Sequence, residues 1–65
     1  MLQVNGEPLD GTGLNTVRDL LDQKGWKADQ VAVELNGTIL RREDFSTIQL
    51  SDGDKLEVVR FVGGG

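Results

Sequence analysis

The sequence predicts an α+β domain in which one helix packs across a mixed sheet of four to five strands. Three observations lead to this class. Two Asn-Gly pairs, Asn5-Gly6 and Asn36-Gly37, each follow a short segment of alternating apolar and polar residues, which is typical of β-hairpins. A capped segment with helical spacing of its apolar residues lies between the two pairs. A β-prone segment, residues 55–62, comes last and completes the sheet.

Residues 2–10 predict the first hairpin. Residues 2–4 alternate between apolar and polar side chains, and Asn5-Gly6 suits a type I′ turn because both of its central positions need positive φ. Pro8 has no backbone N–H to donate, so we expect the second strand of the hairpin at an edge of the sheet.

A helix is predicted from Thr16 to about Lys24. Thr16 is a good N-cap, and Asp19, three residues later, can complete a capping box. Gly25 can supply the left-handed residue that ends the helix, which would turn the next side chain, Trp26, back onto the last turns. One stripe of the helix is apolar and should face the sheet: Val17, Leu20 and Leu21.

The second half of the chain predicts the other strands. Residues 31–35 alternate as in a half-buried strand, and a short strand at residues 38–40 follows the second Asn-Gly turn. Residues 41–47 are polar and irregular, with Phe45 as their only large apolar anchor. Residues 48–50 are compatible with one more short strand.

The side-chain pattern of the last predicted strand indicates that one face of the sheet is covered and the other is open. Leu56 and Val58 project to one side, whereas Val59 and Phe61 project to the other. One face should pack under the helix, and apolar side chains on the open face indicate a docking surface for a partner. The alternative is that Phe61 only covers the sheet within the monomer. The residues assigned to partner docking are Val59, Phe61 and Val62.

The composition excludes several classes of function. With 65 residues and no Cys, the chain fits one small domain with a thin core, so no pocket that encloses a substrate is expected. The absence of His and Cys removes the imidazole base, the thiolate nucleophile and the usual metal ligands. A net charge of −4 disfavours nucleic acid as a partner, and no apolar run is long enough for a membrane span. Because no signal peptide is visible, we expect a cytoplasmic protein that is monomeric by itself.

Three short motifs have ordinary structural interpretations. Gly-Thr-Gly at residues 11–13 lacks the third glycine and the βαβ unit of a dinucleotide-binding loop. Asp-Gly-Asp at residues 52–54 lacks the further ligands of a calcium loop and is typical of a turn. Glu43 and Asp44 lie on a polar segment where nothing would make one an acid and the other a base. We therefore predict that the chain is not an enzyme and binds no metal or cofactor of its own.

The chain ends in three glycines, Gly63, Gly64 and Gly65. Glycine loses the most conformational freedom on ordering, so we expect a domain at residues 1–62 and a flexible tail at residues 63–65. Without Cβ atoms the tail can lie extended in a narrow channel, and its terminal carboxylate is unhindered. An enzyme that adenylates the carboxylate would require both properties. The alternative is a frayed end or an inert linker.

The order, spacing and total length of these features resemble the ThiS family, the ubiquitin-like β-grasp sulfur carriers of thiamine biosynthesis. The resemblance covers essentially the whole chain, and its specificity comes from the combination, because each motif alone is common. The motifs that carry it are Asn5-Gly6, Thr16-Val17-x-x-Leu20-Leu21, Val31-Ala32-Val33-x-x-Asn36-Gly37, Ile39-Leu40-Arg41-Arg42-Glu43, Asp52-Gly53-Asp54 and Gly64-Gly65.

The resemblance implies a β-grasp fold and a function that depends on the last glycine. An E1-like adenylyltransferase of the ThiF type would use ATP and Mg²⁺ to adenylate the carboxylate of Gly65. Sulfur from a cysteine desulfurase route would then replace AMP and leave a thiocarboxylate, which a thiazole synthase of the ThiG type would accept. Gly63 and Gly64 would thread into the active sites of the partners, which would supply all catalysis.

Three other functions share parts of this pattern. A molybdopterin-synthase sulfur carrier has the same tail and fold but is typically longer, and the short loops and the helix motif at residues 16–21 favour the ThiS family. A ubiquitin-like modifier would join its C-terminal glycine to a lysine amine. A β-grasp interaction domain would carry glycines without a chemical role.

Overall fold

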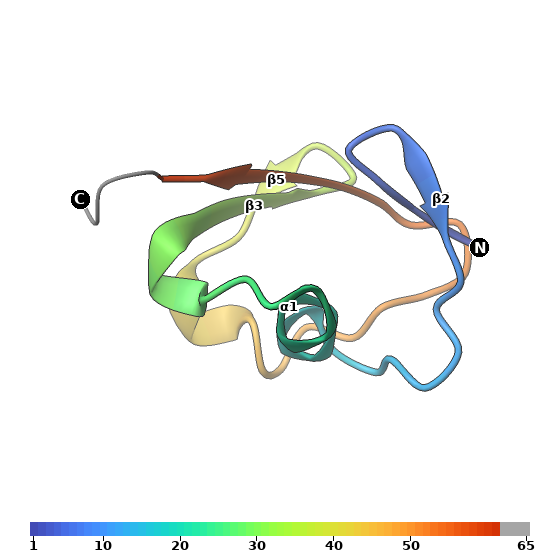
Figure 1. Ribbon diagram of the computed structural model, residues 1–65, viewed down its shortest axis with the longest axis horizontal. Helices are drawn as coiled ribbons and strands as arrows, with labels where there is room; N and C mark the ends of the chain where they lie inside the picture. The colour runs from blue at the N-terminus through green and yellow to red at the C-terminus, as the bar shows by residue number, and fades with distance from the viewer. Residues whose placement is uncertain (62–65) are drawn as a thin grey trace.

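The computed structural model describes residues 1–61, in which five strands form one mixed sheet and one α-helix lies against it (Figure 1). The elements are β1 (Leu2–Val4), β2 (Glu7–Leu9), α1 (Val17–Lys24), β3 (Val31–Leu35), β4 (Thr38–Ile39) and β5 (Lys55–Arg60). The strand order is β2-β1-β5-β3-β4, with β1 and β5 parallel and the other neighbours antiparallel. This architecture confirms the predicted α+β class.

Both predicted hairpin turns are present. Asn5 and Gly6 join β1 to β2 with φ of 52° and 82°, and Asn36 and Gly37 join β3 to β4 with φ of 50° and 87°. Positive φ at both central positions is typical of the type I′ turn, and Asn and Gly adopt it at low cost. The strand that contains Pro8, β2, lies at an edge of the sheet as expected.

Local hydrogen bonds set both ends of α1. The Asp19 N–H donates to the Thr16 hydroxyl at 3.2 Å and the Thr16 N–H donates to the Asp19 carboxylate at 3.0 Å, which is the predicted capping box. At the other end Gly25 adopts a left-handed φ of 74°. The N–H groups of Gly25 and Trp26 donate to carbonyls of the last turns, in the bonding pattern of a Schellman motif. Both predicted helix boundaries are therefore confirmed.

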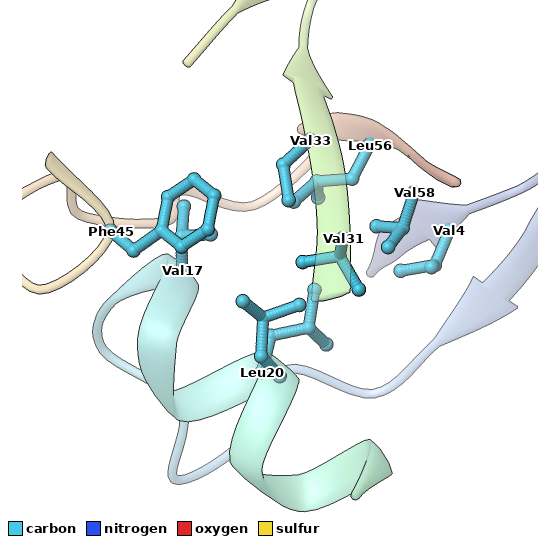
Figure 2. Packing of buried hydrophobic residues seen from close by; sticks show 9 residues of the cluster. Val4, Val17, Leu20, Val31, Val33, Phe45, Leu56 and Val58 are labelled. Carbon is cyan, nitrogen blue, oxygen red and sulfur yellow. The ribbon is translucent and has the colours of Figure 1, made fainter. Parts of the chain in front are cut away.

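One hydrophobic core fills the space between α1 and the sheet (Figure 2). The predicted apolar stripe of the helix is fully buried, with 0% exposure for Val17, Leu20 and Leu21. Phe45 is 2% exposed, and Figure 2 shows its ring beside Val17, so it is the anchor that the sequence predicted for its segment. The buried cluster consists of Val4, Val17, Leu20, Leu21, Val31, Val33, Phe45, Leu56 and Val58.

Residues 48–50 differ from the expectation, because they form no strand of the sheet. They pair instead with the residues that precede α1, through one bridge between Thr16 and Gln49. The Val17 N–H, which has no acceptor inside the helix, donates to the Ile48 carbonyl at 3.1 Å. The segment therefore supplies a hydrogen-bond acceptor to the first turn of the helix and adds no strand to the sheet.

Three smaller differences concern one short helix and the ends of two strands. The segment expected to be irregular contains one turn of 3₁₀ helix, at Arg42–Asp44. β4 ends at Ile39 and β5 ends at Arg60, short of the predicted boundaries. Even so, the Phe61 N–H donates to the Gln30 carbonyl at 2.8 Å, so the chain stays hydrogen-bonded beside the start of β3 for one residue beyond β5.

Replacing Asp19 with Asn should reduce the loss of free energy of unfolding that the domain undergoes as the pH becomes acidic. Hydrogen bonds from the backbone N–H groups of Thr16 and Asn15 hold the pKa of Asp19 below its ordinary value of 3.8. Because the folded-state pKa is the lower one, the ionised carboxylate stabilises the fold above the unfolded-state value, and this contribution is lost as pH falls through the folded-state pKa.

Urea denaturation from about pH 6 down to about pH 2 measures this effect. The free energy of unfolding should fall less over this range for Asp19→Asn than for the wild type. Equal losses in the two proteins would contradict the role assigned to the Asp19 carboxylate.

Candidate functional site

The predicted site lies where β5 leads into the C-terminal glycines. β5 is the middle strand, between β1 and β3, and its last residues lie beside the start of β3 (Figure 1). The structure describes the chain as far as Phe61. The adenylation site at Gly65, the threading residues Gly63 and Gly64, and the docking residue Val62 lie outside the described residues, so these assignments stay predictions.

The side chain of Asn5 holds the second half of β5 in place. β1 pairs with β5 only at Gln3 and Val4, because the chain turns away at Asn5. The Asn5 amide takes the place of a further strand residue: its Nδ2 donates to the Val58 carbonyl at 3.2 Å, and its Oδ1 accepts from the Val58 N–H at 2.7 Å. The sequence predicted Asn5 only as a turn residue. Its contact with β5 joins residues that are 53 positions apart, which no local pattern indicates.

The two faces of β5 differ as predicted. Leu56 and Val58 are 1% and 7% exposed and belong to the core under α1, whereas Val59 and Phe61 are 59% and 52% exposed. The position of Val59 and Phe61 on the uncovered side of the sheet is therefore confirmed. Their role in docking stays a prediction.

The strand register adds further residues to the face that Val59 occupies, because directly opposed residues of antiparallel strands project to the same side. Ala32 is opposite Val59, Glu34 is opposite Glu57, and Ile39 is opposite Glu34. Ile39 is 74% exposed, and sequence reasoning missed it because its side of the sheet depends on the register of β3 and β4. We call this surface the open face; on β3, β4 and the segment from β5 to residue 61 it consists of Ala32, Glu34, Ile39, Lys55, Glu57, Val59 and Phe61.

Two carboxylates lie directly opposite each other within the open face. Glu34 on β3 and Glu57 on β5 form a cross-strand pair, and neither makes an ion pair with a Lys or Arg of the described residues. Like charges in directly opposed positions are destabilising, and cross-strand pairs are worth roughly 0.2–1 kcal/mol. A cation on another molecule would remove this repulsion, so the pair is a candidate contact for a partner.

The described part of the chain shows no metal-binding cluster and no buried polar side chain. The acidic residues considered in the sequence have structural contacts instead. Glu43 and Asp44 each lie 3.6 Å from the Arg41 guanidinium, and the Asp54 carboxylate accepts the Ser51 N–H within its turn at 2.7 Å. The α-helix of this part of the chain has eight residues, far fewer than a bilayer-spanning helix requires.

Comparison with known proteins finds similar small chains and also larger enzymes that contain a similar segment. The sequence model of the ThiS family matches residues 2–65. The sulfur carrier protein ThiS of Bacillus subtilis is 40% identical over 68 residues, with 100% of both chains covered. A thiazole synthase of Paramagnetospirillum magneticum is 41% identical over 64 residues, which are 98% of this chain but only 20% of the length of that enzyme.

A solved structure tests the fold directly. The crystal structure of the thiamine biosynthesis protein ThiS from Geobacter metallireducens is 43% identical to this chain and has a TM-score of 0.78. The match covers 98% of this chain and 97% of that chain. The β-grasp fold implied by the sequence motifs is therefore confirmed.

Phe61→Ala should leave the domain folded and nearly as stable as the wild type, whereas Leu20→Ala should not. Phe61 is half exposed on the open face, so truncation should lower the free energy of unfolding by less than about 1 kcal/mol. Leu20 has 0% exposure, so its truncation opens a cavity under the helix and should cost ~2–5 kcal/mol. Urea denaturation of both variants measures the difference. A loss for Phe61→Ala as large as that for Leu20→Ala would place Phe61 in the core.

Proposed function

Because the chain belongs to the ThiS family, we propose that it is a cytoplasmic sulfur carrier of thiamine biosynthesis that bears its sulfur as a thiocarboxylate on Gly65. The observation that carries the proposal is the 40% identity to a sulfur carrier over 100% of both chains, a match that includes the terminal glycines of this chain. The family membership also favours this function over a molybdopterin-synthase carrier. The alternative is a ubiquitin-like modifier. The two functions differ in where the C-terminal acyl group goes: a carrier holds sulfur on it, whereas a modifier joins it to a lysine amine.

The chemistry needs one activated carboxylate and a sulfur nucleophile from elsewhere. A carboxylate oxygen of Gly65 attacks the α-phosphorus of ATP, and pyrophosphate leaves. A persulfide formed by a cysteine desulfurase route attacks the acyl carbon through its terminal sulfur, and AMP leaves with the oxygen that bridged it to the carrier. A thiol then reduces the resulting acyl disulfide, which releases the thiocarboxylate and leaves the sulfur donor in a disulfide with that thiol. The sequence supports this division of labour, because it contains no Cys to supply sulfur and no His to act as a base. An E1-like adenylyltransferase of the ThiF type would hold ATP and Mg²⁺.

A thiazole synthase of the ThiG type is the proposed acceptor of the sulfur. The support is that a chain named thiazole synthase contains a segment similar to almost the whole of this chain, next to a larger remainder. Joining a carrier and its acceptor in one polypeptide raises the effective concentration of one for the other. We infer that this carrier serves an enzyme of the same kind.

The open face is the proposed docking surface for these partners. It combines exposed apolar side chains at Ile39, Val59 and Phe61 with the carboxylates of Glu34 and Glu57. Such a surface fits a partner that presents apolar residues around at least one Arg or Lys. The face also lies on β5, so a partner bound there would be in reach of the residues that follow Phe61.

Deletion of Gly65 should abolish activation of the carrier while leaving its fold intact. The proposal places the reacting carboxylate on Gly65, so the shortened chain ends one residue too early for the active site of the adenylyltransferase. A bulky residue appended after Gly65 should have the same effect, because it displaces the carboxylate. ATP–pyrophosphate exchange with a ThiF-type enzyme measures activation, and circular dichroism controls for folding. Exchange by the shortened carrier at the wild-type rate would refute the assignment.

Phe61→Ala should weaken binding to the adenylyltransferase by about thirtyfold, which corresponds to ~2 kcal/mol for the loss of an aromatic anchor at an interface. Calorimetric titration measures the dissociation constants. Gln23→Ala is the matched control, because Gln23 is an exposed residue of α1 on the other side of the sheet, and it should bind as the wild type does. Wild-type affinity of Phe61→Ala would place the docking surface elsewhere.

A further inference from the structure

We propose that a basic cleft beside the end of β5 receives an extended acidic segment of the enzyme that takes hold of the C-terminal residues. The cleft has a volume of about 510 Å³, and its walls include Trp26, Lys27, Gln30, Arg60 and Phe61. None of the residues that line it carries a carboxylate. The inference rests on the proposed function for the identity of the partner, and on the cleft itself for the chemistry of the contact.

Trp26 holds two cations at the cleft. The Arg60 Cζ lies 5.2 Å and the Lys24 Nζ lies 5.8 Å from the centre of the Trp26 ring, within the range of a cation–π interaction. The Trp26 backbone is itself fixed, because its N–H donates to the Leu21 carbonyl at 2.9 Å. The Arg60 guanidinium is thus positioned by the ring and yet makes no ion pair with an Asp or Glu of the described residues.

Positive charge extends from the cleft along this end of the molecule. A second hollow, of about 430 Å³, shares Lys27 with the cleft and is also lined by Arg18 and Arg42. Among the acidic groups at this end, Asp22 pairs with Arg18, Asp29 lines the second hollow, and Glu43 and Asp44 follow Arg42 in one turn of 3₁₀ helix. With Lys24 and Arg60, five of the seven cations of a chain with net charge −4 gather here.

The backbone of β5 offers hydrogen bonds at the same place. Alternate residues of a strand direct their N–H and C=O groups to opposite neighbours. The Phe61 N–H faces β3, where it bonds Gln30, and the Val58 N–H and C=O face the other side, where Asn5 bonds them. Arg60 directs its N–H and C=O to the side of Val58, beyond the end of β1. A segment lying in the cleft can pair with this short free edge.

These observations favour a protein segment over a free nucleotide. An extended segment would use the backbone groups of Arg60, place Asp or Glu side chains against Lys27 and Arg60, and follow β5 toward residue 62. The enzyme that activates the terminal carboxylate would approach from this end, because β5 ends there beside the start of β3 (Figure 1).

Charge reversal in the cleft is the test. Arg60→Glu and Lys27→Glu should each lower the association rate with a ThiF-type adenylyltransferase about tenfold at low salt, and should flatten the dependence of that rate on salt concentration. Arg41→Glu is the matched control: it makes the same change of charge at a side chain that is 74% exposed and lies outside the cleft, and its rate should change little. Surface plasmon resonance at several salt concentrations gives the rates, and urea denaturation shows that the variants fold.

The outcomes separate this inference from the proposed function. Wild-type rates and salt dependence for Arg60→Glu and Lys27→Glu would overturn the cleft contact while leaving the carrier function standing. Failure of the wild-type chain itself to bind the adenylyltransferase would overturn both. ATP is titrated into the isolated wild-type chain as well, and binding that Arg60→Glu removes would assign the cleft to a phosphate ligand and overturn the acidic segment.

Discussion

A helix of eight residues can cover only one face of a five-stranded sheet, and the rest of this structure follows from that constraint. All buried side chains of the central cluster gather on the helix side, where Phe45 closes the core that α1 alone would leave open. The other face has no element of the described chain to cover it. Apolar residues such as Val59 and Ile39 therefore remain exposed in the isolated domain and are available to another protein.

The features predicted correctly from the sequence are those that neighbouring residues determine. Asn5-Gly6 and Asn36-Gly37 adopt positive φ for steric reasons that act within the turn itself, and Thr16 and Asp19 cap the helix through bonds three residues apart. Residues 48–50 show the limit of such reasoning. Their alternation suits a strand, but whether they join the sheet or the start of α1 depends on distant groups with free hydrogen bonds.

The candidate site divides in the same way. The alternation of side chains along β5 was sufficient to place Val59 and Phe61 on the open face, because it is a property of one strand. Ile39 and the Glu34–Glu57 pair required the register between strands, and the basic cleft required the relative positions of α1, the segment after it and the end of β5. The role proposed for Gly65 rests on chemistry and on the family, since the terminal glycines lie outside the described residues.

The central claim is that the C-terminal carboxylate becomes a thiocarboxylate, and intact-mass spectrometry of the protein purified from sulfur-replete cells tests it most directly. The account predicts a species heavier by the difference between one sulfur and one oxygen atom, with the added mass located on Gly65 by fragmentation. Treatment with a thiol-alkylating reagent should label that species and no other, because the chain has no Cys. A population that carries only the unmodified carboxylate, or Gly65 joined to a lysine amine, would contradict the account.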